Sequence, residues 1–144
     1  MARSAGRRRA AQRPQGAYAL VLDADGLSKA ASGDPRALAW VARARELNLP
    51  LVVNAVTLTE TLRGAKRDAG IHLLTRHAHV DSVDASFAEQ AGQLLGRSRR
   101  NDTVDALVAV TAIRLGRPAI ILTSDPDDLA ALTADVDGLE VRVV

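Results

Sequence analysis

The amino-acid sequence predicts an α/β fold in which a central, mostly parallel sheet is covered by helices on both faces. Short apolar runs rich in Val, Ile and Leu alternate along the chain with longer segments of helical periodicity. The apolar runs are continuous rather than alternating, which is typical of strands buried on both faces. The chain has 144 residues, of which 47% are hydrophobic and 25% charged, so it can form one domain with a sizeable core.

Each element follows from a local pattern. Five strands are expected from the apolar runs, at 18–22, 50–53, 79–83, 119–122 and 139–144. The first strand should stop at Asp23 and Gly26, and the next helix should start at Asp34, an N-cap residue followed by Pro35. Helices are expected at 34–47, 57–62, 68–76, 84–95, 101–115 and 125–133. A basic loop is expected at 96–100, and Gly116 should close the helix that follows this loop.

The N-terminal segment differs from the rest of the chain in its charge. Residues 1–16 contain five arginines and no acidic residue, whereas acidic residues outnumber basic ones in the remainder. We expect 1–16 to be a disordered basic tail, which either binds polyanions or is simply solvated. The folded domain should then span 17–144.

The composition excludes several classes of protein. The chain has no Cys, so disulfides, thiolate metal sites and Cys nucleophiles are excluded, and a reducing cytoplasm fits. Its apolar stretches are too short to span a membrane. Tyr18, Trp40 and Phe87 are the only aromatic residues, which argues against a stacking platform for single-stranded nucleic acid.

Acidic residues follow two of the predicted strands and begin two of the predicted helices. Asp23 and Asp25 follow the first strand, Asp125 follows the strand at 119–122, and Glu60 and Asp105 lie near helix starts. Ligands of parallel α/β sheets bind at the carboxyl ends of the strands, so these acids are expected to converge there. Helix capping is the alternative: a capping box joins Thr57 to Glu60 and another joins Asp125 to Asp128, while Asp105 could serve the helix dipole.

Asp105 is the acid that capping explains least well. The eight residues after it carry no charge, so their helix should be buried on nearly all sides. A carboxylate at the edge of a core is costly unless it has a partner. Mg²⁺ or Mn²⁺ would relieve the repulsion between converging carboxylates, and such sites hydrolyse phosphodiesters.

The acidic motifs resemble those of the PIN-domain ribonucleases, specifically the VapC-type toxins of bacterial type II toxin–antitoxin modules. The resemblance covers 18–144 and is carried by LVLD at 20–23, VTLTE at 56–60, DALVAVTA at 105–112 and ILTSDPDDL at 121–129. It implies a PIN-like three-layer α/β/α sandwich and a Mg²⁺- or Mn²⁺-dependent endoribonuclease. It also implies a cytoplasmic homodimer that acts on RNA and is inhibited by a small antitoxin protein.

The resemblance implies catalytic and metal-binding roles for the four acids of the family, here Asp23, Glu60, Asp105 and Asp125. It implies supporting roles for three further side chains, Thr123, Asp128 and Asp25. Thr123 would orient a carboxylate or a water, and Asp128 would add a contact to the metal or its ligands. The family more often has a small polar residue in place of Asp25, so the number of metal ions stays open.

Two basic clusters flank these acids and are candidates for phosphate contacts. One precedes Asp105 and comprises Arg97, Arg99 and Arg100; the other follows Glu60 and comprises Arg63, Lys66 and Arg67. Either cluster could instead be solvated surface.

Two other functions remain open at this point. The segment LDADG at 22–26 also resembles the first motif of haloacid-dehalogenase-type phosphatases, in which Asp23 would be the nucleophile. That family needs a Lys shortly before its last acids, and the last Lys here is Lys66. A non-catalytic PIN-fold binding module is the second alternative, although such a module should have lost acids.

Overall fold

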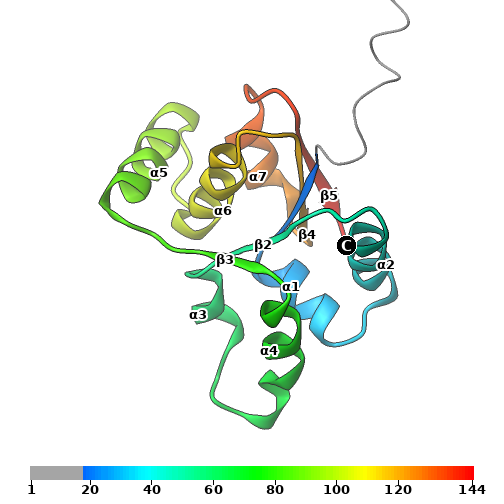
Figure 1. Ribbon diagram of the computed structural model, residues 1–144. Coiled ribbons are helices and arrows are strands. Elements are labelled where there is room, and N and C mark those ends of the chain that lie inside the picture. The colour runs from blue at the N-terminus through cyan, green and yellow to red at the C-terminus, as the bar shows by residue number, and fades with distance from the viewer. Residues whose placement is uncertain (1–17) are drawn as a thin grey trace, which may run out of the picture.

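The computed structural model describes residues 18–144, so the tail predicted at 1–16 lies outside the described residues. Five strands form one sheet in the order β3-β2-β1-β4-β5, and every neighbouring pair is parallel. The strands are β1 (Ala19–Leu22), β2 (Leu51–Asn54), β3 (His79–Asp81), β4 (Ala119–Thr123) and β5 (Leu139–Val143). Helices lie on both faces of this sheet (Figure 1), which confirms the predicted α/β/α sandwich.

Side-chain caps fix the start of several helices. Asp34 accepts hydrogen bonds from two backbone N–H groups of its helix, Asp84 accepts one from Phe87 N, and Asp102 accepts one from Asp105 N. The helices are α1 (Ala24–Ala31), α2 (Pro35–Glu46), α3 (Thr57–Thr61), the 3₁₀ turn η1 (Lys66–Asp68), α4 (Ala69–Arg76), α5 (Ala85–Ser98), α6 (Thr103–Arg114) and α7 (Pro126–Thr133).

Helix α1 is absent from the sequence-based expectation, because Gly26 indicated a turn. In the structure Asp23 is the N-cap of α1, and its Oδ1 accepts a hydrogen bond from Gly26 N at 2.7 Å. A Cβ on Gly26 would lie 2.6 Å from the carbonyl oxygen of Leu122 in β4. The glycine therefore lets the first turn of α1 approach the end of β4 closely.

The predicted basic loop at 96–100 is also corrected in part. Helix α5 continues through Ser98, whose hydroxyl donates to the carbonyl oxygen of Leu94. The helix ends at Arg99, which has the left-handed backbone conformation common at helix C-termini, with φ of 56°.

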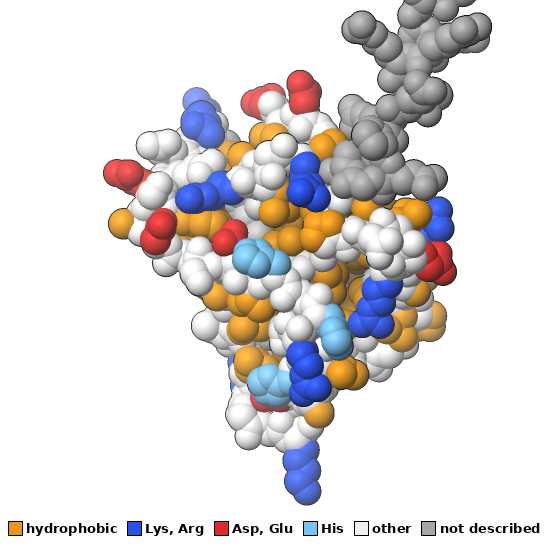
Figure 2. Space-filling model, in the orientation of Figure 1, with side chains coloured by type: hydrophobic (Ala, Val, Ile, Leu, Met, Phe, Trp, Pro, Cys, Tyr) orange, Lys and Arg blue, Asp and Glu red, His pale blue; other side chains and the backbone are white. Residues whose placement is uncertain are grey.

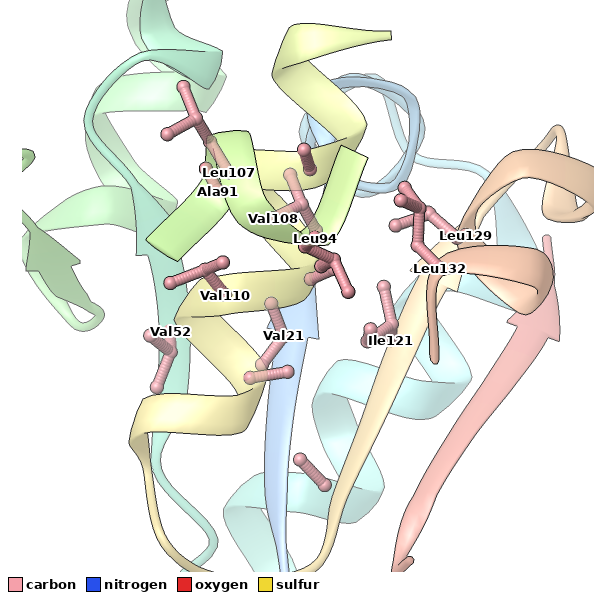
Figure 3. Close-up of a cluster of buried hydrophobic side chains, with 14 of the residues drawn as sticks. Val21, Val52, Ala91, Leu94, Leu107, Val108, Val110, Ile121, Leu129 and Leu132 are labelled. Carbon is pink, nitrogen blue, oxygen red and sulfur yellow. The ribbon is translucent and has the colours of Figure 1, made fainter. Parts of the chain in front are cut away.

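Each face of the sheet has its own hydrophobic cluster. On one face Val21, Val52 and Ile121 of the sheet pack against α5, α6 and α7 (Figure 3). On the other face Leu20 and Leu22 pack against α1, α2 and α4. Residues 106–112 of α6 are all buried, as the uncharged sequence after Asp105 predicts. Asp105 therefore begins a helix that is anchored in the core.

Gly26→Ala should destabilise the protein by about 1–3 kcal/mol, because the new methyl group overlaps a backbone atom that cannot swing away. Gly92→Ala, inside α5, is the matched control, since nothing lies within 4 Å of a Cβ there. The control should be neutral or stabilising by up to about 1 kcal/mol. Urea denaturation measures both changes. Equal unfolding free energies for Gly26→Ala and the wild type would show that α1 does not need this close approach.

Candidate active site

Of the acids predicted from the sequence, all but Asp128 line one cavity of about 360 Å³ at the carboxyl ends of the strands. Its walls come from the β1–α1 junction, α3, the start of α6 and the β4–α7 loop. The cavity is lined by Asp23, Ala24, Asp25, Ser28, Glu60, Asp102, Val104, Asp105, Thr123 and Asp125. No described Lys, Arg or His lines it, so the carboxylates have no cationic side chain among the residues of its wall.

The capping alternatives for Glu60 and Asp125 do not form. Helix α3 begins after Val56 without a side-chain cap, and the Thr57 hydroxyl instead donates to the carbonyl oxygen of Asn54 at 2.7 Å. Asp125 occupies the N-cap position of α7, but its carboxylate accepts no capping hydrogen bond. Both carboxylates are exposed on the cavity wall, so neither is used to cap its own helix.

Asp23, Asp25 and Thr123 lie where β1 and β4 end side by side. Asp23 is only 7% exposed, at the floor of the cavity. The buried Thr123 hydroxyl accepts a hydrogen bond from Asp125 N at 3.1 Å, and so fixes the loop that carries Asp125. Asp25 is exposed and accepts a hydrogen bond from the Ser124 hydroxyl, which ties α1 to the same loop.

Asp102 is not among the site residues expected from the sequence, yet it lies within the acidic site. One carboxylate oxygen from each of Asp102, Asp105 and Asp128 lies within 4.8 Å of the others. Arg100 donates to Asp128 Oδ1 at 2.8 Å, so Asp128 already has a cationic partner. Asp102 also caps α6, and this capping role alone would explain an Asp at that position in the sequence.

Two buried polar side chains that no sequence pattern singles out join the helices of the site. Asn54 ends β2, and its Nδ2 donates to the hydroxyl of Thr111 in α6 at 3.0 Å. Its Oδ1 accepts a hydrogen bond from Val56 N at 2.8 Å. Both side chains are completely buried, so the network fixes α3, which carries Glu60, relative to α6, which carries Asp105.

Burial, together with the neighbouring acids, raises the pKa of two carboxyl groups in the cavity. Burial raises the pKa of Asp105 to about 7, and the neighbouring charges of Asp102, Asp23, Asp128 and Asp125 contribute to this rise. Burial likewise raises the pKa of Asp23 to about 6, against the opposing hydrogen bonds from Gly26 N and Thr123. A cation in the cavity would oppose both shifts, because it favours the charged form of each carboxyl group.

The metal-free protein should lose stability as the pH rises from about 4 to about 7. The pKa values of Asp23 and Asp105 are raised from 3.8 to about 6 and about 7, so the folded state binds more protons than the unfolded state in this window. Thermal melts in chelator from pH 4.5 to 8 should show a falling melting temperature, with a shallower fall for Asp105→Asn. A melting temperature that rises between pH 5 and pH 7 would contradict this.

The donor set fits a divalent cation such as Mg²⁺ or Mn²⁺. Carboxylate oxygens are the ligands that these hard cations prefer, and here several carboxylates from separate elements face one cavity. Burial and the neighbouring carboxylates both raise the pKa of Asp105, so a cation bound in the cavity would stabilise its charged form.

A family model for the PIN domain matches residues 20–134. The chain belongs to the PIN domain family. PIN domains are generally nucleases, and the four acids predicted from the sequence all lie within the matched range. No curated protein sequence matches the chain.

Solved structures confirm the fold. One similar chain comes from a crystal structure of VapBC2 from Rickettsia felis, bound to a DNA fragment from its promoter. The TM-score is 0.64 and the sequence identity 12%, and the match covers 87% of this chain and 98% of that one. VapBC-1 from nontypeable Haemophilus influenzae matches with a TM-score of 0.60 and 20% identity, over 86% and 96%. A toxin–antitoxin complex from Klebsiella pneumoniae matches with a TM-score of 0.62 and 19% identity, over 84% and 95%. The PIN-like fold expected from the sequence is thereby confirmed.

Among residues 18–144, no helix is both long and apolar enough to cross a membrane.

Proposed function

We propose that this PIN domain is a Mg²⁺- or Mn²⁺-dependent endoribonuclease, and that it is the toxin of a toxin–antitoxin pair. The observation that carries the proposal is the convergence of Asp23, Glu60, Asp105 and Asp125 on one cavity without a described basic side chain in its wall. Four elements supply these acids, and no helix cap accounts for Glu60 or Asp125. The match to the PIN family argues against the haloacid-dehalogenase-type phosphatase. The presence of all four acids argues against a non-catalytic binding module.

In this proposal the metal would be held by Asp23, Glu60, Asp105 and Asp125, of which Asp23 and Asp105 are the more buried. A divalent cation held there would supply a water of lowered pKa and would stabilise charge on the leaving oxygen. Glu60 and Asp125, which are exposed on the cavity wall, would add carboxylate oxygens that bind the metal or accept hydrogen bonds from water. Thr123 fixes Asp125 through its backbone, and Asp128 and Asp25 support the rim.

Incubating the full chain with a 5′-labelled single-stranded RNA tests the activity. We expect internal cleavage products with Mg²⁺ or Mn²⁺ and none in chelator. Because water rather than the ribose 2′-hydroxyl is the nucleophile, no product should end in a cyclic phosphate. Cleavage that persists in chelator, or release of inorganic phosphate from a phosphomonoester without RNA cleavage, would contradict the proposal.

The proposed partners follow the structural neighbours. Two of these are VapBC assemblies and a third is a toxin–antitoxin complex, which supports a small antitoxin as the binding partner of this chain. A homodimer and a cytoplasmic location remain predictions from the family resemblance. Co-expression with the product of a small reading frame next to this gene should suppress toxicity and yield a stable complex.

A further inference from the structure

A second cavity adjoins the acidic one, and basic side chains outnumber acidic ones in its wall: three basic residues face two acidic ones, Glu60 and Asp68. It has a volume of about 420 Å³ and shares two wall residues, Ser28 and Glu60, with the acidic cavity. Its basic side chains come from α1 and from the segment between α3 and α4: Lys29, Arg63 and Arg67. In Figure 2, a Lys or Arg side chain projects from the lower tip of the molecule, where Figure 1 places the chain between α3 and α4. We call this second cavity the basic groove.

The loop that carries Arg63 is held in one conformation by a buried carboxylate. Asp68 Oδ2 accepts hydrogen bonds from the backbone N–H groups of Arg63, Gly64 and Ala65, at 2.9, 2.7 and 3.2 Å. These bonds, led by that of Arg63, lower the pKa of Asp68, so its carboxylate stays charged in the wall of the groove while it holds the loop. The Arg63 guanidinium in turn donates to the carbonyl oxygens of Thr59 and Leu62.

The other basic cluster is placed differently. Arg97, Arg99 and Arg100 are not buried, and none of them lines the acidic cavity or the basic groove. Arg100 is paired with Asp128. Arg67, by contrast, is exposed on the wall of the basic groove, and the structure gives its side chain no hydrogen bond or ion pair within the described residues.

We propose that the basic groove binds the phosphates of a single RNA strand beside its cleavage site, through Arg63 and Arg67. This inference rests on the proposed nuclease function. A polyanion must approach a cavity lined by acids, and the adjoining cations offset that repulsion. The groove contains no aromatic side chain among its described wall residues, so binding depends on the backbone rather than on stacked bases. A single strand fits better than a duplex, because the scissile phosphate must reach Asp23 on the cavity floor.

The test compares two doubly substituted proteins that lose equal charge. Arg63→Gln/Arg67→Gln removes both groove arginines, and Arg97→Gln/Arg99→Gln is the matched control in the other cluster. Binding of a fluorescein-labelled 12-nucleotide single-stranded RNA is followed by anisotropy in chelator, over a series of KCl concentrations. Chelator prevents metal-dependent cleavage, so binding is measured independently of the proposed activity.

We expect the groove variant to bind about 10-fold more weakly than the wild type, and the control to stay within about twofold. The slope of log affinity against log salt should become shallower by about 0.7 for each phosphate that the variant no longer neutralises. A merely structural role would not change this slope. If the double substitution unfolds the protein, Arg67→Gln alone tests the groove, because its side chain holds no part of the fold.

The basic groove would be ruled out as an RNA site if the groove variant and the wild type bound RNA with equal affinity. It would also be ruled out if the Arg97→Gln/Arg99→Gln control lost more RNA affinity than the groove variant, or if the wild type showed no salt-sensitive RNA binding. Tighter binding of a polyglutamate peptide than of RNA, abolished in the groove variant, would assign the groove to an acidic protein segment and overturn the proposal too. If the groove variant loses RNA binding but the wild type cleaves no RNA with any metal, the proposed nuclease function fails and the groove stands.

Discussion

Replacing Asp105 by Asn should reduce Mg²⁺-dependent RNA cleavage by at least about 100-fold while the fold survives. Losing a residue that merely supports a metal ligand already costs about 10–100-fold in many metal sites, so losing a ligand should cost more. The substitution preserves size, and the backbone N–H of residue 105 can still donate to the Asp102 cap. Single-turnover cleavage with saturating enzyme measures the effect on the chemical step.

The matched control is Asp84→Asn. Asp84 also lies at a helix N-terminus, where it accepts a hydrogen bond from Phe87 N, but it does not line the acidic cavity. Asn caps helices about as well as Asp does, so this variant should cleave RNA like the wild type. Undiminished cleavage by folded Asp105→Asn would remove Asp105 from the metal site.

The same substitution should leave the metal-free protein at least as stable as the wild type. The charge of Asp105 is opposed by those of Asp102, Asp23, Asp128 and Asp125, so neutralising it relieves repulsion without removing packing. If Asp105 acted through the helix dipole instead, its loss would cost up to about 1 kcal/mol. Thermal melts at pH 8 in chelator, where the wild-type carboxylate is ionised, separate the two cases by the sign of the change.

Added metal should then widen the difference between the two proteins. Metal at 100 times its dissociation constant stabilises the folded state by about 2.7 kcal/mol. For a domain of this size, that corresponds to a rise of roughly 10 °C in melting temperature. The wild type and Asp84→Asn should show this rise, and Asp105→Asn should show much less. An equal rise in all three proteins would indicate that metal binds elsewhere.

The sequence was sufficient to predict the sheet and the principal acids. Continuous apolar runs predict parallel strands buried on both faces, and parallel strands place the residues that follow them at one edge. Asp23 and Asp125 could therefore be brought together from sequence alone. The uncharged stretch after Asp105 likewise predicted a core helix with an acid at its start, and 106–112 are all buried.

The features that the sequence did not predict depend on how distant segments pack against one another. Gly26 is a residue type common in turns, and only the approach of Leu122 explains it inside a helix. Asn54 and Thr111 are 57 positions apart, so no local spacing predicts their hydrogen bond. Asp102 is an ordinary helix cap in sequence, and its second role arises because α7 brings Asp128 beside α6.

The two basic clusters show the same limit. Both flank acids of the site in sequence, so spacing alone gives no reason to prefer Arg63 and Arg67 over Arg97 and Arg99. The structure distinguishes them because the segment between α3 and α4 lines a groove that shares Glu60 with the acidic cavity, whereas the end of α5 lines neither.

Direct measurement of Mn²⁺ uptake tests most directly whether the converging acids form a metal site. Free Mn²⁺ is followed by electron paramagnetic resonance as the full chain is added, for the wild type, Asp105→Asn and Asp84→Asn. We expect saturable Mn²⁺ uptake by the wild type and Asp84→Asn, displaced by Mg²⁺, and at least about 10-fold weaker uptake by Asp105→Asn. Uptake by Asp105→Asn equal to that of the wild type, or no uptake by the wild type at millimolar Mn²⁺, would contradict the assignment of these acids to a metal site.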